Sequence, residues 1–358
     1  MSQGRITVID GSPVDARKVT QQDQPIVLPG FIDTHVHGGD GFDIMQGGAA
    51  VEAVARCHAR HGTTSLLATT MTAPKAEIES ALRALAPACV QRPSQGARVL
   101  GVHLEGPYIN PDKLGAQPAY AAPMLIGDVL RLHALAPLLL ITLAPELPGH
   151  LDGIAALREA GFVVQLGHSN GSYEEGLAAL EQGATGFTHL FNVMTGLHHR
   201  APGMVGAALA HARYAEIIPD LLHVHPGAIR TALRAIPGLF CVTDSTSATG
   251  MPDGDYQLGR HRVFKCMGGV RLADGVLAGS ALTMDQALRN LVGLGLALDD
   301  ASRRVSTYAA DFLGRADLGR LSPGAKADFV VLDQSLALQR VFIEGIEIER
   351  HTDAQRGA

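Results

Sequence analysis

The chain carries a pair of histidines, His35 and His37, at the end of the apolar run Leu28-Pro-Gly-Phe-Ile-Asp-Thr-His-Val-His37. If this run is a β-strand, side chains alternate between its two faces, so both imidazoles leave the strand on the same side. Two imidazoles placed in this way can bind a metal ion. The alternative for a lone His-x-His is a buried pair of hydrogen-bonded histidines, and the rest of the chain decides between the two.

Four further residues with metal-binding or acid–base side chains follow other strand-like runs at the same relative position: Glu105, His168, His189 and Asp244. Together with the first two histidines they give four imidazoles and two carboxylates. Such nitrogen and oxygen donors suit Zn²⁺ or Fe²⁺ and leave a position for water. Glu105 is the natural bridge if two ions bind.

Two neighbouring residues have open roles. Asp33 lies on the same strand face as the first two histidines. Asp33 is expected either to accept a hydrogen bond that fixes the tautomer of a ligand histidine or to accept hydrogen bonds from buried backbone N–H groups. His103 lies on the Glu105 face but one step deeper, so it is predicted to fill the interior rather than to bind metal.

The elements that must position these side chains are short apolar runs that alternate with helical stretches. Eight strands are expected, at 28–37, 63–68, 99–104, 138–143, 162–166, 186–190, 215–218 and 239–243. Helices are expected between them, for example at 49–61, 74–85, 151–160, 173–182 and 226–235. Eight β/α units predict the α/β class and a (β/α)₈ TIM-type barrel, whose open face lies at the carboxyl ends of the strands. The candidate chemical groups all fall at that face.

The chain ends predict a second, smaller domain. Short β-type runs occur at 5–9 and 26–28, and strand-like runs return at 324–333 and 341–343. The segment 282–313, which precedes these last runs, is expected to form two amphipathic helices. We therefore expect residues 1–27 and 314–358 to form one small β-sandwich-like domain, and residues 28–313 to form the catalytic barrel.

Composition excludes several classes of function. The 358-residue chain has a net charge of −6, and its Lys and Arg residues are spread along it, which argues against nucleic acid binding. No apolar run approaches the length of a membrane span. The four cysteines show no Cys-x-x-Cys spacing, and the first residues lack the apolar core of a secretory signal. These features predict a cytoplasmic globular protein with free thiols.

Several motifs resemble those of the amidohydrolase superfamily, in the same order and over nearly the whole chain. They are Pro29-Gly-Phe-Ile-Asp-Thr-His-Val-His37, His103-Leu-Glu-Gly-Pro-Tyr-Ile-Asn110, Gly167-His-Ser-Asn170, Thr188-His-Leu-Phe-Asn192, Val242-Thr-Asp244 and Gly319-Arg-Leu-Ser-Pro-Gly-Ala-Lys-Ala-Asp328. Within the superfamily, His-Leu-Glu-Gly-Pro and Thr-His-Leu-Phe-Asn resemble the branch of N-acetylglucosamine-6-phosphate deacetylases. The resemblance implies metal-dependent hydrolysis of an acetamide on a sugar phosphate, which yields glucosamine 6-phosphate and acetate.

The resemblance also implies a metal site. In that branch, the positions of Glu105, His168 and His189 bind a metal. The first-strand pair varies, because members with Gln-x-Asn hold one ion and members with His-x-His can hold two. His35 and His37 match the second kind, so one or two divalent ions per subunit are implied, with Zn²⁺ or Fe²⁺ expected.

The reaction implied by the resemblance gives Asp244 a catalytic role. An acetamide is unreactive, so the metal must lower the pKa of a water molecule and polarise the carbonyl, and the departing amine must be protonated. Asp244 can take the proton from this water and deliver it to the nitrogen, acting as general base and then general acid. The alternatives for Asp244 are a metal ligand or a cap of the strand end.

Contacts for the sugar phosphate are also implied. Arg200 corresponds to an arginine that reaches the phosphate of the neighbouring active site across a homodimer interface, and a guanidinium binds phosphate bidentately. Further substrate contacts are implied at Asn192, Val193 and His223. Without the resemblance, Arg200 would be expected to be an ordinary surface residue. His223 would be expected to lie at the start of a helix.

Two positions depart from the branch. Gln117 stands where many members have a histidine that touches the substrate near the amide, and a glutamine cannot carry positive charge. Leu221 replaces the glycine of the usual Asp-Gly before His223. Four hypotheses therefore stay open: N-acetylglucosamine 6-phosphate as substrate, its galactosamine epimer, another amide on the same barrel, and a non-enzymatic scaffold.

Overall fold

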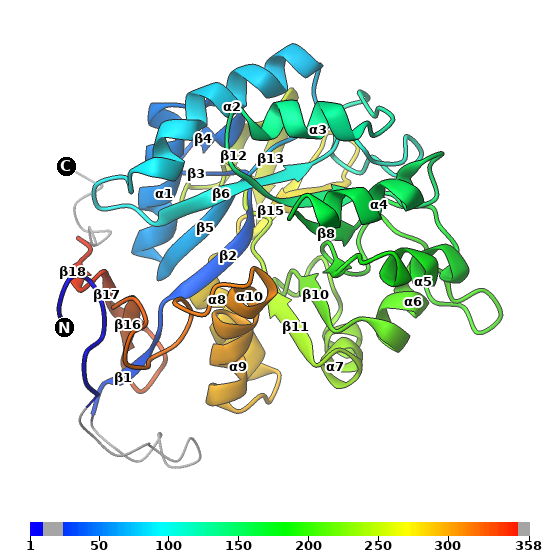
Figure 1. Ribbon diagram of the computed structural model, residues 1–358. Helices are drawn as coiled ribbons and strands as arrows, with labels where there is room; N and C mark the ends of the chain where they lie inside the picture. The colour runs from blue at the N-terminus through cyan, green and yellow to red at the C-terminus, as the bar shows by residue number, and fades with distance from the viewer. Residues whose placement is uncertain (10–23, 350–358) are drawn as a thin grey trace.

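The computed structural model describes residues 1–9 and 24–349, and its centre is a curled sheet of parallel strands (Figure 1). Six strands are hydrogen-bonded in chain order: β2 (Phe31–Val36), β5 (Thr63–Thr69), β6 (Arg98–Glu105), β7 (Leu138–Leu143), β8 (Val163–Leu166) and β9 (Gly186–Phe187). Every residue of β2 and β5 is buried, as expected of parallel strands covered on both faces. The first six predicted strands are therefore confirmed in type and order.

Two more parallel strands, β10 (Tyr214–Ile217) and β11 (Gly238–Cys241), pair with each other. Backbone hydrogen bonds join this pair to the curled sheet on both sides. Leu190 N donates to Glu216 O at 2.8 Å, and Asp244 N donates to His35 O at 3.0 Å. These links are consistent with the predicted TIM-type barrel, in which the last strand returns to the first.

Helices follow the strands and pack around the outside of the sheet (Figure 1). They are α1 (Ala49–Arg60), α2 (Lys75–Val90), α3 (Ile126–His133), α4 (His150–Glu159), α5 (Tyr173–Glu181), α6 (Gly203–His211) and α7 (Pro226–Ala235). Local signals set several of their starts: Ser172 closes a capping box on α5, and proline opens α7. The helices predicted by range are all present, and α2 continues beyond its predicted end through Pro87.

An antiparallel sheet pairs the strand at Ile26–Pro29 with strands near the end of the described chain. Its strands, in spatial order, are β1 (Ile26–Pro29), β16 (Phe329–Leu332), β17 (Leu338–Ile343) and β18 (Ile346–Glu347). The run 5–9 was predicted to be β-type, but it forms no strand, and only Arg5 bridges to Lys326. The turn at Pro323 and Gly324 interrupts the facing segment, so a longer ladder cannot form there. Residues 10–23 and 350–358 of the predicted domain lie outside the described residues.

This terminal sheet shares its hydrophobic core with the curled sheet. Val330 and Val341 belong to the same buried cluster as Phe31 of β2. Arg98 of β6 forms ion pairs with Asp328 at 2.9 Å and with Glu344 at 3.0 Å. Among residues 1–9 and 24–349 the terminal strands make one layer and not the expected sandwich, because their apolar face packs on the central sheet. The division into two domains stays a prediction.

A second antiparallel sheet, which the sequence analysis did not predict, follows β11. It consists of β12 (Gly254–Leu258), β13 (His261–Cys266), β14 (Gly269–Arg271) and β15 (Leu277–Ser280), and a short hairpin of β3 (Gly38–Gly39) and β4 (Phe42–Asp43) follows β2. Leu258, Val263 and Val270 form its small core together with Met71. Its strands are short and mostly polar, so they carry only a weak hydrophobic pattern.

The segment 282–313 was predicted to form two helices, and this prediction is wrong. It forms three: α8 (Met284–Gly293), α9 (Leu298–Arg304) and α10 (Thr307–Phe312). The chain turns at Val305 and Ser306, where the backbone of Ser306 departs from helical angles and separates α9 from α10. Among the described residues, every helix is too short or too polar to span a lipid bilayer.

Candidate active site and metal centre

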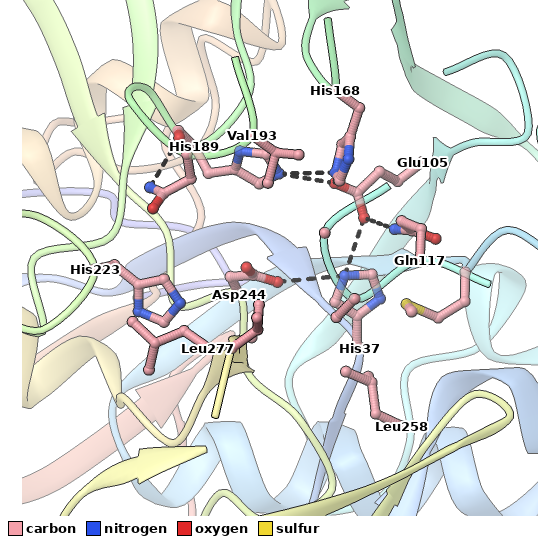
Figure 2. A pocket seen from close by; sticks show the side chains of 16 residues that line it. His37, Glu105, Gln117, His168, His189, Val193, His223, Asp244, Leu258 and Leu277 are labelled. Carbon is pink, nitrogen blue, oxygen red and sulfur yellow. Dashed lines mark hydrogen bonds and ion pairs between the residues drawn. The ribbon is translucent and has the colours of Figure 1, made fainter. Parts of the chain in front are cut away.

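Side chains at the carboxyl ends of several central strands converge on one cluster of donor atoms (Figure 2). Glu105, the last residue of β6, lies at its centre. Its Oε1 is 3.1 Å from both His168 Nε2 and His189 Nε2, and these two nitrogens are 3.2 Å apart. We call these three donors the first cation site.

The other oxygen of Glu105 faces a second group of donors. Glu105 Oε2 is 3.2 Å from His37 Nε2 and 3.4 Å from His35 Nε2. Asp244 Oδ1 completes the group at 3.3 Å from His37 Nε2 and 3.5 Å from His35 Nε2. We call these four donors the second cation site, and Glu105 joins it to the first.

The spacing and chemistry of both sites fit a divalent cation. Tetrahedral Zn²⁺ holds nitrogen ligands at about 2.0–2.1 Å, which separates neighbouring donors by about 3.3 Å. The donor separations in both sites lie close to that value. His35 faces His37 through their Nε2 atoms, and His168 faces His189 in the same way. Two deprotonated imidazole nitrogens at this distance repel each other unless a cation lies between them.

The pKa values of the protein groups show which charge the cluster requires. Burial opposes a charge on His37, but the carboxylates of Asp244 and Glu105 outweigh burial and raise its pKa to about 9. Burial would raise the pKa of Glu105, yet His35 and His168 hold it well below its usual range. Both directions have one cause, because buried carboxylates need positive charge beside them. Divalent cations would supply that charge when they bind.

Three of the converging side chains come from residues with left-handed backbone. The angle φ is 49° at His168, 29° at His189 and 50° at Asp244. A non-glycine residue seldom adopts positive φ, and each such residue costs on the order of 1–3 kcal/mol. These residues lie two or three positions after the ends of β8, β9 and β11, and the turn there aims their side chains at the cluster. Backbone strain of this kind gathers at functional sites.

The structure decides the two roles that the sequence left open. Asp33 accepts hydrogen bonds from Thr243 Oγ1 at 2.6 Å and from Thr243 N at 3.2 Å, so it ties β2 to the chain after β11. Burial raises the pKa of Asp33 to about 7. His103 Nε2 lies 2.7 Å from Thr142 Oγ1, and its Nδ1 lies 3.1 Å from Thr34 O. His103 is therefore hydrogen-bonded in the interior, where it also lies close to His35 and Glu216.

A cleft of about 200 Å³ opens over the two cation sites. Figure 2 shows Glu105 between His37 and the pair His168 and His189, with Asp244 beside His37. Part of the apolar wall comes from the unpredicted sheet, through Leu258 and Leu277.

Gln117, predicted to bind substrate, lies in the cleft wall and holds the central carboxylate. Its Nε2 donates to Glu105 Oε2 at 2.6 Å, and its Oε1 accepts from Thr72 N at 2.7 Å. A neutral amide donates and accepts at once, whereas a protonated imidazole only donates. The glutamine therefore has a contact with a candidate metal ligand that the sequence analysis did not foresee.

The candidate phosphate contacts lie on another side of the cleft. His223 Nδ1 is 2.6 Å from Asp220 Oδ2. Burial favours the neutral ring, but Asp220 outweighs burial and raises the pKa of His223. The Asn192 side chain donates to His189 O at 3.0 Å, which shapes the loop, and no backbone acceptor in the described chain takes the N–H of Val193. This side thus offers an imidazole ring whose protonated form Asp220 favours, and a backbone donor.

The loop before His223 has left-handed backbone at Leu221. Leu221 has a φ of 66°, in the left-handed region where glycine is favoured. Asp220 Oδ1 accepts from the backbone N–H groups of Leu222 and His223 at 2.9 Å and 2.8 Å. These bonds support a conformation that is costly for leucine, on the order of 1–3 kcal/mol.

Arg200 is the predicted site residue that lies away from the cluster. It is exposed on the loop between β9 and α6, and its Nη1 lies 2.7 Å from His199 Nε2. It does not line the cleft of its own chain. Its predicted role therefore depends on a second subunit.

Sequence reasoning missed one buried residue of this region, Glu216 near the end of β10. It is fully buried, and its Oε2 lies 3.1 Å from His35 Nδ1. The available signal was a single charged residue inside the apolar run Ala215-Glu-Ile-Ile218. A carboxylate is seldom buried without a partner, so its place in a predicted central strand pointed to the interior cluster.

Comparisons with known proteins agree on one family. A model described as the amidohydrolase family matches residues 26–348. The chain is 42% identical to N-acetylgalactosamine-6-phosphate deacetylase of Escherichia coli O157:H7, over 96% of this chain and 93% of the relative. It is 39% identical to N-acetylglucosamine-6-phosphate deacetylase of Vibrio furnissii, over 89% of this chain and 82% of the relative.

A solved structure extends this similarity to the fold. An aspartate-to-alanine variant of N-acetyl-D-glucosamine-6-phosphate deacetylase from Mycobacterium smegmatis was solved in complex with N-acetyl-D-glucosamine 6-phosphate. It matches this chain with a TM-score of 0.88 and 33% identity, over 97% of this chain and 93% of that one. Likeness in sequence and fold thus covers nearly the whole molecule.

Proposed function

The chain belongs to the amidohydrolase family, and we propose that it hydrolyses the acetamide of N-acetylglucosamine 6-phosphate to glucosamine 6-phosphate and acetate. The observation that carries the proposal is the bridging position of Glu105, whose two oxygens face two groups of histidine nitrogens at the base of one cleft. The N-acetylglucosamine-6-phosphate deacetylases that share 35–39% identity over most of the chain support it.

We propose that the two cation sites hold one or two divalent ions per subunit, with Zn²⁺ or Fe²⁺ preferred. The donors are imidazole nitrogens and carboxylate oxygens, which suit these borderline ions. When bound, such an ion polarises the acetamide carbonyl and lowers the pKa of a water molecule. His168 and His189 would hold one ion with Glu105, and His35 and His37 would hold the other.

We propose that Asp244 carries the proton during the reaction. Burial favours its neutral form, but His35 and His37 outweigh burial and hold the pKa of Asp244 below its usual range, so the carboxylate is ionised. It accepts a proton from the water whose oxygen bonds to the carbonyl carbon. It then delivers this proton to the amide nitrogen as the C–N bond breaks, so the amine leaves uncharged.

We propose that the phosphate of the substrate binds where His223, Val193 and Asn192 line the cleft. The Asp220 carboxylate favours a protonated His223, which attracts an anion. The backbone N–H of Val193 can donate to a phosphate oxygen. Gln117 lies at the other side of the cleft, where it holds Glu105 near the acetamide end of the substrate.

We further propose a homodimer in which Arg200 of each subunit reaches the neighbouring active site. Its exposed loop and its distance from the cleft of its own chain support this arrangement. A guanidinium supplies the bidentate contact that a phosphate accepts.

Arg200→Ala is expected to reduce kcat/KM for the phosphorylated sugar by roughly 10- to 100-fold, mainly through KM, because one charged hydrogen-bonding partner is lost. The unphosphorylated sugar should be unaffected. Steady-state kinetics with both sugars measure the difference. The matched control is Arg230→Ala, which removes another exposed arginine, from α7. Equal losses on both sugars would assign Arg200 a structural role.

Mixed dimers test the crossing of the interface. Subunits with Arg200→Ala and subunits with Asp244→Asn are each expected to be poorly active alone. If Arg200 serves the neighbouring site, a mixed dimer contains one complete site, with Asp244 from the first subunit and Arg200 from the second. Activity should therefore return on mixing after reversible dissociation. Mixed dimers without recovered activity would place Arg200 in the site of its own chain.

The galactosamine epimer is a second candidate substrate. It is favoured by the 42% identical relative from Escherichia coli O157:H7, which is an N-acetylgalactosamine-6-phosphate deacetylase. It is also favoured by Gln117, which replaces a histidine of many glucosamine enzymes and is bonded to Glu105. Both substrates require the same acetamide chemistry and differ only in the configuration of one hydroxyl group.

Acetate release tests the proposal. The metal-replete protein is assayed with N-acetylglucosamine 6-phosphate, N-acetylgalactosamine 6-phosphate and unphosphorylated N-acetylglucosamine. The expected result is a preference for the first substrate by kcat/KM. A preference for the second would establish the epimer as substrate. Failure with all three, while the protein retains metal, would contradict a sugar phosphate as substrate.

We also propose a cytoplasmic location. The cysteines Cys57, Cys89, Cys241 and Cys266 are all free thiols, which supports a reducing compartment. Fractionation of the source cells, with detection of the protein by antibody, would test it.

A further inference from the structure

Glu216 is a buried carboxylate that the proposed reaction does not use. It lies near the end of β10 with no exposed surface. Its Oε1 accepts a hydrogen bond from Thr34 Oγ1 at 2.8 Å, and its Oε2 lies 3.1 Å from His35 Nδ1. Its Oε2 is also 3.4 Å from the backbone N–H of His189. Burying an ion costs several kcal/mol unless its partners are well placed, so these contacts hold Glu216 in a defined position.

The contact with Glu216 fixes the state of the His35 ring. An ionised carboxylate only accepts hydrogen bonds, so His35 Nδ1 must carry the proton. His35 Nε2 faces the second cation site, and once it gives up its proton it presents its lone pair there. It lies 3.4 Å from Glu105 Oε2 and 3.5 Å from Asp244 Oδ1. Glu216 therefore contacts His35, a donor of that site, on the ring nitrogen that faces away from the site. Glu216 itself does not line the cleft.

The second cation site has no other oriented ring. His37 Nδ1 is buried and has no hydrogen-bond partner within the described residues. In the first cation site, the ring of His168 is held independently, because its Nδ1 lies 2.8 Å from Lys113 O. An outer partner that fixes a ligand histidine typically changes metal affinity by about 10- to 100-fold.

We propose that Glu216 is a positioning residue that fixes the tautomer of His35 and thereby enables the second cation site to hold a divalent ion. Its one contact with the first site in the described chain is the long hydrogen bond from the backbone N–H of His189, and it bonds to neither imidazole ring of that site. The inference rests on the proposed metal centre and is independent of the sugar substrate.

The variant Glu216→Gln tests this role, because it keeps the size of the side chain and removes its charge. Zn²⁺ is titrated into metal-free protein against a chromophoric chelator, and bound zinc is counted by mass spectrometry after gel filtration. The wild type should show two binding steps. In the variant, one step should weaken by about 10- to 100-fold while the other changes little. Bound zinc should fall from two ions per subunit toward one.

Two controls separate positioning from a general loss of structure. Thr142→Val removes a buried hydroxyl that bonds to His103 and Thr188 in the same interior but touches no candidate ligand side chain, and both binding steps should persist. His37→Ala removes a donor of the second site and provides the one-ion reference. If Glu216→Gln does not fold, Glu216→Asp keeps the charge but withdraws it by one methylene, and the same selective loss is expected.

Each outcome has a defined meaning. Equal weakening of both steps, or two unchanged steps, would overturn the role of Glu216 while leaving the two-ion centre intact. A wild-type protein that binds one zinc ion at saturation would overturn the two-ion centre, and the role of Glu216 with it. Neither result depends on acetate release, so failure of the substrate assignment is recognised separately.

Discussion

Asp244→Asn is expected to lower kcat by about 10²- to 10⁴-fold while the protein keeps its metal. An asparagine has the same shape and can place its side-chain oxygen where Asp244 Oδ1 now lies, 3.3 Å from His37 Nε2. It cannot accept a proton at neutral pH, so the attacking water loses its base and the amine loses its acid. Acetate release and metal content, measured on the same preparation, separate the two effects.

Asp33→Asn is the matched control for this variant. Asp33 is also buried and lies within the central strand β2, but it bonds to Thr243 and does not line the cleft. Its replacement should lower thermal stability and leave kcat within about tenfold of the wild type, because no proton transfer depends on it. If Asp244→Asn retains near-normal kcat, Asp244 has no part in proton transfer. If it loses metal instead, Asp244 is chiefly a ligand.

Glu105→Gln is expected to remove metal from both cation sites. Glu105 is the residue whose side chain faces both groups of donors: Oε1 faces the first site and Oε2 the second. A neutral amide presents one oxygen in place of two and supplies no charge. Affinity at each site should fall by more than about 100-fold, beyond the loss usual for an outer partner. The measurement is bound metal after dialysis, and turnover should fall in parallel.

The control for Glu105→Gln is Glu146→Gln. Glu146 accepts hydrogen bonds from Asn110 and Ser169 near the loop that carries His168, but it is not a donor of either cation site. Its replacement should leave bound metal near the wild-type value. Retention of two ions by Glu105→Gln would contradict the bridging role. Retention of one ion would show that its two oxygens do not serve the sites equally.

The sequence by itself determined the part of this protein that local chemistry encodes. Parallel strands that are buried on both faces consist of continuous apolar runs. The strands of the central sheet could therefore be predicted directly from the sequence. A side chain at the end of such a strand must point to the open face, so His35, His37 and Glu105 could be placed together without a structure. The short strands between residues 254 and 280 and the break between helices at Ser306 could not be predicted in this way. Short amphipathic segments carry little periodic signal.

Only the tertiary structure decided which atoms meet. Alternation along β2 places Asp33 on the same face as the two histidines. Because the chain after β11 returns beside β2, Asp33 accepts a hydrogen bond from Thr243 instead. The partner of the His35 ring is instead Glu216, 181 residues away in the chain. Gln117 likewise bonds to Glu105 because the loop after β6 folds back over its own strand. Sequence spacing sets the direction of a side chain, whereas contacts between distant segments arise only when the sheet curls and brings its strand ends to one place.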